Sequence, residues 1–479
     1  MTDHKQADED VLRRAAIDRS ARLPVLFFFT SAAVWLAISV VLGFIQSVKL
    51  YAPGFLDAPW LFFLNYGRSN PAFMGALVYG WSIQAGMGVA IWLMARLCRA
   101  EVKNPLTLVV AGHFWNLGVL IGVLGIFAGY GTSMEWLAFP RAVWPVLLVA
   151  YSLVVVWLIT MFQRREPGEV YISVWYILGA CFWFPWIYIT ANVFIHVLPG
   201  AAVAKAATNV WFMSSMIFLV LVPLGLASAY YFIPKILGRP VYSSQLAKIG
   251  FWGLAILGGW TGIQKFMGGP LPAWMPAVSG VAVILMLVPI LAIAINHHMT
   301  IKGNHSLIET SPTMRFTAAG ALAFTVFCIL SALSAFFSLG QFTQISQTTM
   351  AFQLLAVYGF FSLTIFGAIY FIVPRLTGCE WPSGSRIRLH FWFSTYGIVS
   401  LVFLHFVGGI WQAAAYSQFD APLENAVSAG RPYAIGASIA WAPIMVSNVM
   451  FLYHLSLMVL RLGRRNEDPT LLGHQHPAT

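Results

Sequence analysis

Long apolar runs alternate with short polar segments along almost the whole chain. A helix needs about 20 residues to cross the hydrocarbon core of a bilayer, and it satisfies its own backbone hydrogen bonds there. Twelve runs have about this length, and they lie near residues 23–46, 72–97, 105–130, 143–163, 170–196, 208–234, 245–263, 276–297, 314–338, 349–375, 389–415 and 437–460. The pattern therefore predicts an all-α integral membrane protein with twelve transmembrane helices in the lipid bilayer.

The composition excludes the main alternatives to a membrane protein. Hydrophobic residues make up 59% of the chain and charged residues 9%, whereas a soluble protein carries about 25% charged residues. The four cysteines have no paired spacing, and Cys-x-x-Cys-His does not occur in the sequence. We therefore expect neither a disulfide scaffold nor a covalently attached haem of the c type.

The basic residues predict the orientation of the chain. An even number of spans puts both termini on one side, and 21 of the 27 Lys and Arg residues fall on that side. The positive-inside rule therefore places both termini in the cytoplasm. The formal net charge of +11 is thus a topology signal, and no nucleic-acid partner is expected. The six basic residues expected on the opposite side are Lys49, Arg68, Arg141, Lys205, Lys265 and Arg431.

Two polar segments flank the predicted membrane domain. Residues 1–22 form a cytoplasmic polar tail, and the apolar run that follows is a retained helix because it lacks a small-residue cleavage site. The membrane domain covers 23–465, and the polar segment 466–479 is expected to be a disordered cytoplasmic tail. The tail histidines His474 and His476 are interpreted as solvated.

Two spans end in similar sequences, which points to an internal repeat. The segments are AYYFIPKILGRP at 229–240 and AIYFIVPRLTGC at 368–379. Proline removes a backbone donor, so we expect it to end each helix, with the basic residue at the negative helix terminus. The second, sixth and tenth spans begin near residues 72, 208 and 349. This spacing favours three units of four helices, although a generic interfacial motif is the alternative.

The most distinctive segments of the chain lie around the sixth and seventh spans. They read NVWFMSSMIFLVLVPLGLASAYYFIPKILGRPVYS (209–243), FWGLAILGGWTGIQKF (251–266) and LPAWMP (271–276). Together with GAIYFIVPRLTG (367–378), RLHFWFSTYGIVS (388–400), YGRSNPAF (66–73) and GHFWNLGVLIGVLGIFAG (112–129), they resemble subunit I of haem-copper oxidases, specifically of the cbb3-type cytochrome c oxidases. The resemblance implies a subunit I-like bundle with a pseudo-threefold arrangement of four-helix units, in a bacterial cytoplasmic (inner) membrane.

The resemblance also implies a set of metal-ligand positions. Subunit I of the family holds two haems and a copper with six histidines and carries a catalytic tyrosine. In this sequence the tyrosine position falls at Gly258. The six histidine positions fall at Phe73, Ser214, Gln264, Lys265, Phe352 and Leu354.

None of these six residues suits the family's metals. Phe and Leu have no lone pair for iron, and a charged Lys265 would repel copper. The second, sixth, seventh and tenth spans contain no histidine, so a shift of the alignment does not restore the site. We therefore predict no catalytic and no metal-binding residues in this arrangement, no cofactor, and bulky side chains in the vacated space. Haem b binding is expected only if residues at other positions serve as its ligands.

Three histidines elsewhere in the spans are candidates for relocated haem ligands, although hydrogen bonding between helices is the commoner role of such residues. They are His113, His405 and His454.

Three functions remain open from the sequence. The first is a cytochrome c oxidase subunit I-like protein of a respiratory electron-transport complex that has lost its haem and copper ligands. It would act as a scaffold or partner subunit beside other membrane subunits of a cbb3-like complex, with a haem-c subunit as a further partner. The second is an active haem-containing oxidoreductase with relocated ligands. The third is a repurposed twelve-helix transporter. Transporters generally carry ionisable groups near the middle of the membrane, whereas all 16 acidic residues of this chain lie in tails, loops or span ends, which argues against this function.

Overall fold

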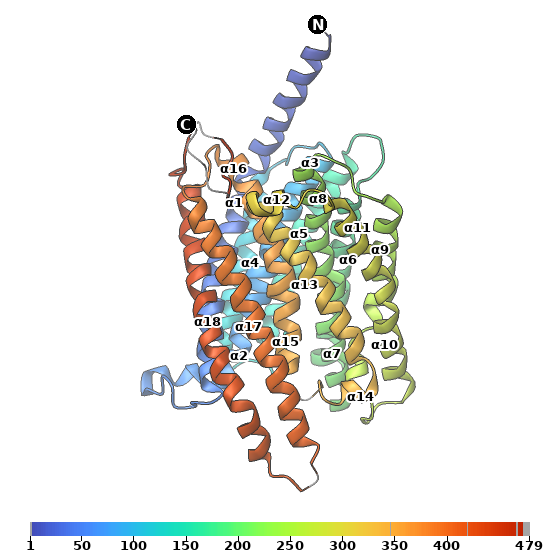
Figure 1. Ribbon diagram of the computed structural model, residues 1–479, viewed down its shortest axis with the longest axis vertical. Coiled ribbons are helices and arrows are strands. Elements are labelled where there is room, and N and C mark those ends of the chain that lie inside the picture. The colour runs from blue at the N-terminus through green and yellow to red at the C-terminus, as the bar shows by residue number, and fades with distance from the viewer. Residues whose placement is uncertain (1, 345, 419, 466–467, 473–479) are drawn as a thin grey trace.

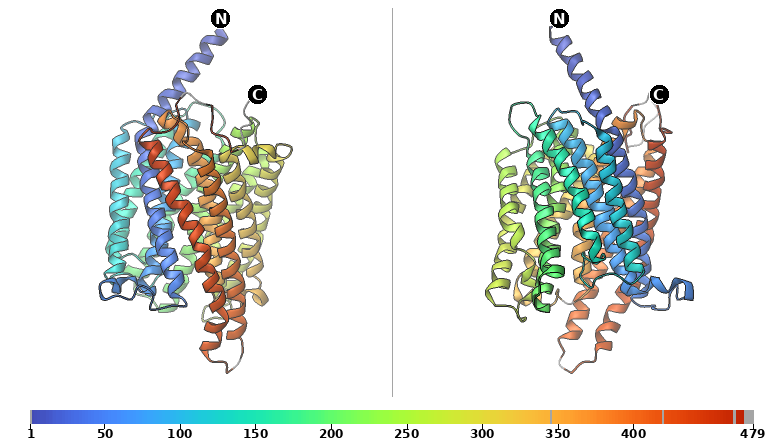
Figure 2. Two further views of the ribbon diagram at one scale, coloured as in Figure 1. Left: turned by 60° about the vertical axis from the view of Figure 1, so that its left-hand side comes forward. Right: turned by 180° about the vertical axis from the view of Figure 1, so that it is seen from behind.

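The computed structural model describes residues 2–344, 346–418, 420–465 and 468–472. These residues form one bundle of helices without a strand, and 12 helical stretches are long and apolar enough to cross a membrane (Figure 1). The predicted all-α membrane class is therefore confirmed. Both ends of the chain lie at the same end of the bundle (Figure 2), as an even number of spans requires.

The elements follow one another along the chain with short connections. They are α1 (Thr2–Lys49), η1 (Pro59–Leu64), α2 (Tyr66–Gly75), η2 (Ala76–Ile83), α3 (Gln84–Leu97), α4 (Pro105–Phe127), η3 (Arg141–Val143), α5 (Trp144–Gln163), α6 (Ile172–Asn192), η4 (Val193–Val197), α7 (Ala202–Met216), η5 (Ile217–Leu221), α8 (Val222–Leu237), α9 (Ser244–Leu257), η6 (Gly258–Trp260), η7 (Ile263–Phe266), α10 (Trp274–Leu285), α11 (Leu287–Ile301), α12 (Ser306–Thr310), α13 (Pro312–Ser334), α14 (Phe337–Gly340), α15 (Thr348–Leu354), η8 (Leu355–Ser362), α16 (Leu363–Thr377), α17 (Gly384–Tyr416) and α18 (Leu423–Val459).

Three spans, the second, sixth and tenth, form the inside of the bundle. Each is an α-helix interrupted in its middle by a π-helical segment, namely η2, η5 or η8, and every residue of these segments is buried. Segment η8 contacts both others, and Trp81 Nε1 donates to Ser362 Oγ at 2.7 Å. The π-helix is rare and is used mostly in single turns. A further π-helical segment, η4, ends the fifth span, but the mid-span segments recur in every fourth span, which agrees with the predicted three units of four helices.

The helices α8 and α16 end in similar sequences, but glycine and not proline ends them. Pro234 and Pro374 lie inside α8 and α16, and each helix continues for about one more turn. The helices end at Gly238 and Gly378, whose φ angles are 66° and 70°. Glycine adopts this left-handed conformation without a Cβ penalty, and its N–H donates to the proline carbonyl. The prediction that proline ends these helices is therefore wrong.

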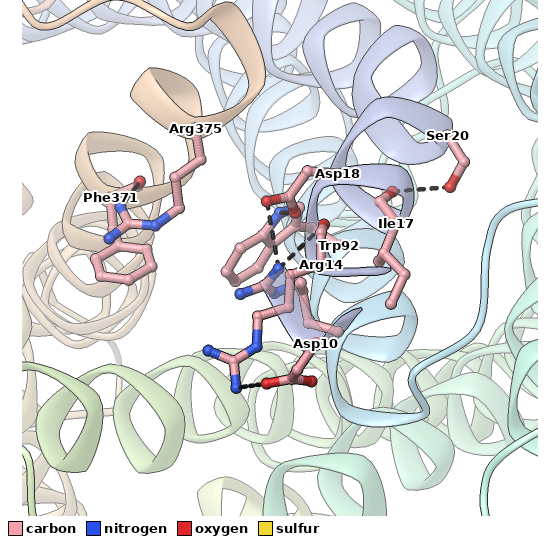
Figure 3. A network of polar contacts seen from close by, with 9 residues as sticks. Asp10, Arg14, Ile17, Asp18, Ser20, Trp92, Phe371 and Arg375 are labelled. Atoms are coloured by element: carbon pink, nitrogen blue, oxygen red, sulfur yellow. Dashed lines mark hydrogen bonds and ion pairs between the residues drawn. The ribbon is translucent and has the colours of Figure 1, made fainter. Parts of the chain in front are cut away.

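The polar segment 1–22 continues directly into the first span, because α1 begins at Thr2. Charged groups tie this helix to the bundle (Figure 3). Asp18 accepts a hydrogen bond from Trp92 Nε1 at 3.1 Å and pairs with Arg96 Nη1 at 3.3 Å. Arg96 Nη1 also donates to the Arg14 carbonyl at 3.3 Å. Asp18 therefore joins α1 to α3 through an ion pair and a hydrogen bond.

The described part of the C-terminal segment, 468–472, packs on the same end of the bundle. Leu472 N–H donates to the Thr310 carbonyl at 2.7 Å, and Thr470 Oγ1 donates to Glu380 Oε2 at 3.0 Å. The side chain of Leu472 is 2% exposed. The expectation of disorder is therefore wrong for these residues, since backbone and apolar contacts hold them. Residues 466–467 and 473–479, which include His474 and His476, lie outside the described residues.

Candidate functional site

Four of the six histidine positions of the family meet at one pocket. Ser214, Gln264, Lys265 and Phe352 all line a cavity of about 70 Å³. The residues come from α7, η7 and α15, and Figure 1 shows α7 and α15 in the half of the bundle away from the termini. The structure therefore brings together positions that the sequence separates by more than a hundred residues.

The turn after α9 and η6 places Gln264 and Lys265 at this pocket. Gly262 has a φ of 109°, which only glycine adopts readily. A Cβ atom at Gly262 would lie 2.8 Å from the Val210 carbonyl oxygen of α7. The turn therefore requires glycine both for its backbone conformation and for its close approach to α7.

Hydrogen bonds fix Gln264 at the wall of the pocket. Its Oε1 accepts from Gly262 N–H at 2.7 Å and from Ser279 Oγ at 2.7 Å. These two bonds engage the carbonyl oxygen of the side-chain amide. The amide NH₂ group of Gln264 has no hydrogen-bond partner among the described residues and remains a donor.

Ser214 is held in a similar way. Its Oγ lies 2.7 Å from Thr261 Oγ1, and Thr261 Oγ1 in turn donates to the Gly258 carbonyl at 2.9 Å. Thr261 has one hydroxyl proton, so Ser214 is the donor of the first bond. Ser214 is left with lone pairs and no proton for a ligand.

Gln353 connects the pocket to the loop before η3. Its Nε2 donates to Glu135 Oε1 at 2.6 Å, and its own Oε1 is buried without a hydrogen-bond partner among the described residues. Asn209 of α7 holds the backbone of Glu135 by two hydrogen bonds, at 2.8 and 3.2 Å. Our sequence analysis missed Gln353 and Glu135. The sequence offered one hint, which is that the polar residue Gln353 lies between Phe352 and Leu354, the two positions that the resemblance assigns to haem ligands.

Lys265 is the only cation among the residues that line the pocket. Its ammonium group forms no hydrogen bond and no ion pair with any described residue. Glu135, which accepts a hydrogen bond from Gln353, acts on it electrostatically without direct contact. The pocket therefore contains an ammonium group that lacks a direct partner.

The side chains that line the pocket include no imidazole, and the thioether of Met213 is the one metal-ligating type among them. They include no His, Cys, Asp or Glu. No group of three or more such residues occurs anywhere in the described part of the chain. A water molecule needs about 10–15 Å³ of such space, so the cavity of about 70 Å³ has room for about five waters.

The other two family positions lie in the packed interior. Phe73 of α2 is 0% exposed, and its ring meets that of Trp441 edge-on at a centroid distance of 5.4 Å. Leu354 of α15 is 1% exposed. Both belong to the main hydrophobic core. Apolar side chains therefore occupy the two positions that the sequence resemblance assigns to ligands of the low-spin haem.

The three candidate relocated ligands lie on three different helices. His113 of α4 is exposed on the outside of the bundle, with its ring 4.6 Å from that of Phe27. His405 of α17 is 2% exposed, and its Nδ1 lies 3.4 Å from Gln347 Oε1. His454 of α18 is 1% exposed and packs on a tryptophan ring. The Nε2 atoms of His405 and His454 are buried without a described partner.

Comparisons with known proteins agree on one family. Residues 23–453 match the family model described as Cytochrome C and Quinol oxidase polypeptide I. A cytochrome c oxidase subunit 1 homolog of Agrobacterium tumefaciens (strain T37) is 24% identical over 458 residues, covering 91% of this chain and 82% of the relative. The cbb3-type cytochrome c oxidase subunit CcoN1 of Stutzerimonas stutzeri is 24% identical over 397 residues, covering 80% and 82%.

A solved structure shares the fold. It is a cryo-EM structure of a heme-copper terminal oxidase dimer, with a TM-score of 0.72 and 13% sequence identity. The match covers 95% of this chain and 87% of the solved one. At this identity the likeness concerns the path of the backbone alone.

Proposed function

The chain belongs to the cytochrome c and quinol oxidase polypeptide I family, and we propose that it is a non-catalytic member of it. In this proposal the protein is a cbb3-like subunit I relative in a respiratory electron-transport complex. It has lost the haem and copper ligands and serves as a scaffold or partner subunit.

One observation carries the proposal. The copper and high-spin haem positions of the family converge at a pocket lined by Ser214, Gln264, Lys265 and Phe352. Copper sites use imidazole and thiolate, and haem iron takes His, Met, Cys or Tyr. A serine hydroxyl that already donates its proton, an amide, an ammonium and a phenyl ring supply none of these ligands.

The packing around Phe73 supports the same conclusion for the low-spin haem. A cavity in a packed core costs about 24 cal/mol per Å³, so a vacated haem site is expected to be refilled. Phe73 and Trp441 fill their part of the interior with rings that are 0% and 1% exposed.

The proposed partners are other membrane subunits of a cbb3-like complex, with a haem-c subunit as a further one. The α17–α18 pair extends beyond the rest of the bundle at the end away from the termini (Figure 2). Near its tip, Trp411 is 57% exposed and Leu423 is 62% exposed. A projection that exposes large apolar side chains beside polar ones suits contact with another subunit. We place the protein in a bacterial inner membrane with both termini cytoplasmic, since 21 of its 27 basic residues lie on that side.

The test is a cofactor analysis of the purified full chain. The protein is expressed in a host that assembles cbb3-type oxidases, and a catalytic subunit I purified in parallel serves as control. Haem is measured by the pyridine haemochromogen method and copper by mass spectrometry. We expect fewer than about one haem and one copper per ten chains. One haem or more per chain contradicts the proposal.

A second candidate function is a haem protein with relocated ligands. The observation that favours it is the pair of buried, unpartnered Nε2 atoms of His405 and His454. Haem that is present in the wild type and lost in His405→Ala or His454→Ala supports this alternative. Saturable solute flux in proteoliposomes instead favours the transporter alternative.

A further inference from the structure

We propose that the pocket around Lys265 binds one small monovalent anion that is weakly hydrated, of the size and charge of nitrate or bromide. The proposal rests on the side chains of the pocket and not on the scaffold role, because cofactor loss and anion binding are measured separately.

The first argument is the charge of the pocket. The Lys265 ammonium is the only cation in the lining, and none of the lining residues is acidic. It has no direct partner among the described residues. Lys265 is half-buried, so its ammonium is partly removed from bulk water, and a partly desolvated charge without a partner carries a free-energy cost. An anion in the cavity supplies the missing countercharge, whereas water alone does not.

The second argument is the set of free donors. The Gln264 amide uses its oxygen for the bonds to Gly262 and Ser279, so its NH₂ group is left for a ligand. Gln344 lines the same cavity and forms no hydrogen bond with the described residues. One ammonium and two amide NH₂ groups thus border a single cavity. Amide N–H groups and ammonium groups are suitable donors for an anion.

The third argument is selectivity by size and hydration. A cavity of about 70 Å³ admits an anion of a few atoms. Part of the wall is apolar, formed by Phe218, Phe327 and Phe352. Strongly hydrated anions such as sulfate lose more hydration free energy on entering such a site than nitrate or bromide does. The Glu135 carboxylate behind Gln353 also limits the positive charge and disfavours a divalent anion.

The experiment uses the purified full chain in detergent. It is titrated with sodium nitrate, sodium bromide and sodium sulfate by isothermal calorimetry at constant ionic strength. Lys265→Met removes the charge and keeps the length of the side chain. Lys205→Met is the matched control, because Lys205 lies in the first turn of α7 at the same end of the bundle and does not line the pocket.

We expect saturable binding of nitrate and bromide near one site per chain, with at least tenfold weaker binding of sulfate. Lys265→Met should weaken nitrate binding at least tenfold, and Lys205→Met should leave it within twofold. Absence of saturable binding to the wild type overturns the proposal, as does equal binding by Lys265→Met. The wild-type titration decides the question even if the variant does not fold. Haem analysis of the same sample shows independently whether the proposed function fails.

Discussion

The two ends of the bundle differ in how they accommodate charge. At the end with the termini, Asp18 lies between Arg96 and Trp92, and Glu166 pairs with Arg13 and Arg99. At the other end, Lys265 stands at its pocket without a direct partner. In the first arrangement, Asp18 and Glu166 find cationic partners within the chain itself. The second leaves one charge to be satisfied by something else.

The two ends of the sixth and tenth spans also differ in how similar their sequences are. Toward the termini, α8 and α16 end alike, with a proline inside the last turn and a left-handed glycine after it. Toward the pocket, the same spans carry Ser214 and Phe352, which are unlike each other and unlike metal ligands. We infer that packing and helix ends specify the arrangement of these inner helices.

The largest expected effect is at the paired end. Asp18→Leu leaves Arg96 without its countercharge, and the side chain of Arg96 is 14% exposed. Breaking a fully buried pair costs about 3–5 kcal/mol, so we expect about 2–3 kcal/mol for this partly buried one. The free energy of unfolding is measured by SDS titration in mixed micelles. The double variant Asp18→Leu with Arg96→Leu should recover part of the loss. A single variant as stable as the wild type contradicts the pairing.

A smaller loss is expected at the turn that forms the pocket. Gly262→Ala forces a side chain into a left-handed conformation and toward the Val210 carbonyl. Strain of this type costs about 1–3 kcal/mol. Gly54→Ala is the control, because a Cβ at Gly54 meets nothing within 4 Å and its φ is not positive. Equal stability of the two variants, in the same SDS assay, would show that the turn is not strained.

The substitution Lys265→Met should have the opposite sign from Asp18→Leu. Lys265 has no direct partner that its removal would leave behind, and only a longer-range attraction to Glu135 is lost, so in anion-free buffer we expect a change between zero and a gain of about 1 kcal/mol. In nitrate, the wild type should gain stability through binding and Lys265→Met should not. Destabilisation of Lys265→Met by more than about 1 kcal/mol without nitrate would reveal an internal partner.

The smallest expected effect is the pH dependence of an exposed pair. Hydrogen bonding and charge from Arg13, with Arg99, lower the pKa of Glu166 from its ordinary value of 4.5. The folded pKa lies below the unfolded one, so the contribution to stability is full above pH 4.5 and is lost as the pH falls through the folded pKa. Glu166→Gln should remove this part of the acid sensitivity. The measurement is the thermal unfolding midpoint of the wild type and of Glu166→Gln between about pH 6 and 3.5. If the midpoint falls equally steeply with pH in both proteins, Glu166 does not contribute to the acid sensitivity.

Most of the architecture follows from the sequence because spans of about 20 apolar residues have few alternatives in a bilayer. The twelve spans and the repeat at every fourth span were predictable. The helix ends were not, since Pro234 and Pro374 fit into a last helical turn and the following glycines decide the end. The extension of α1 to Thr2 also depends on tertiary contacts, such as those of Asp18 with Trp92.

The site could be predicted only as a set of positions. The resemblance identifies Ser214, Gln264, Lys265 and Phe352 as ligand positions, but the sequence shows neither that they line one cavity nor the size of that cavity. Gln353 and Glu135 were missed because their hydrogen bond joins segments 218 residues apart, which no local pattern reveals. The identity of the lining was thus predictable from the family, whereas its hydrogen bonding was not.

The most direct test of the account is an experimental density map of the native complex that resolves side chains. The account predicts the Phe352 ring and the Lys265 side chain at the pocket, and Phe73 packed against Trp441 where the family carries its low-spin haem. Planar macrocycle density at either place, or a metal coordinated beside Ser214 and Gln264, would contradict it.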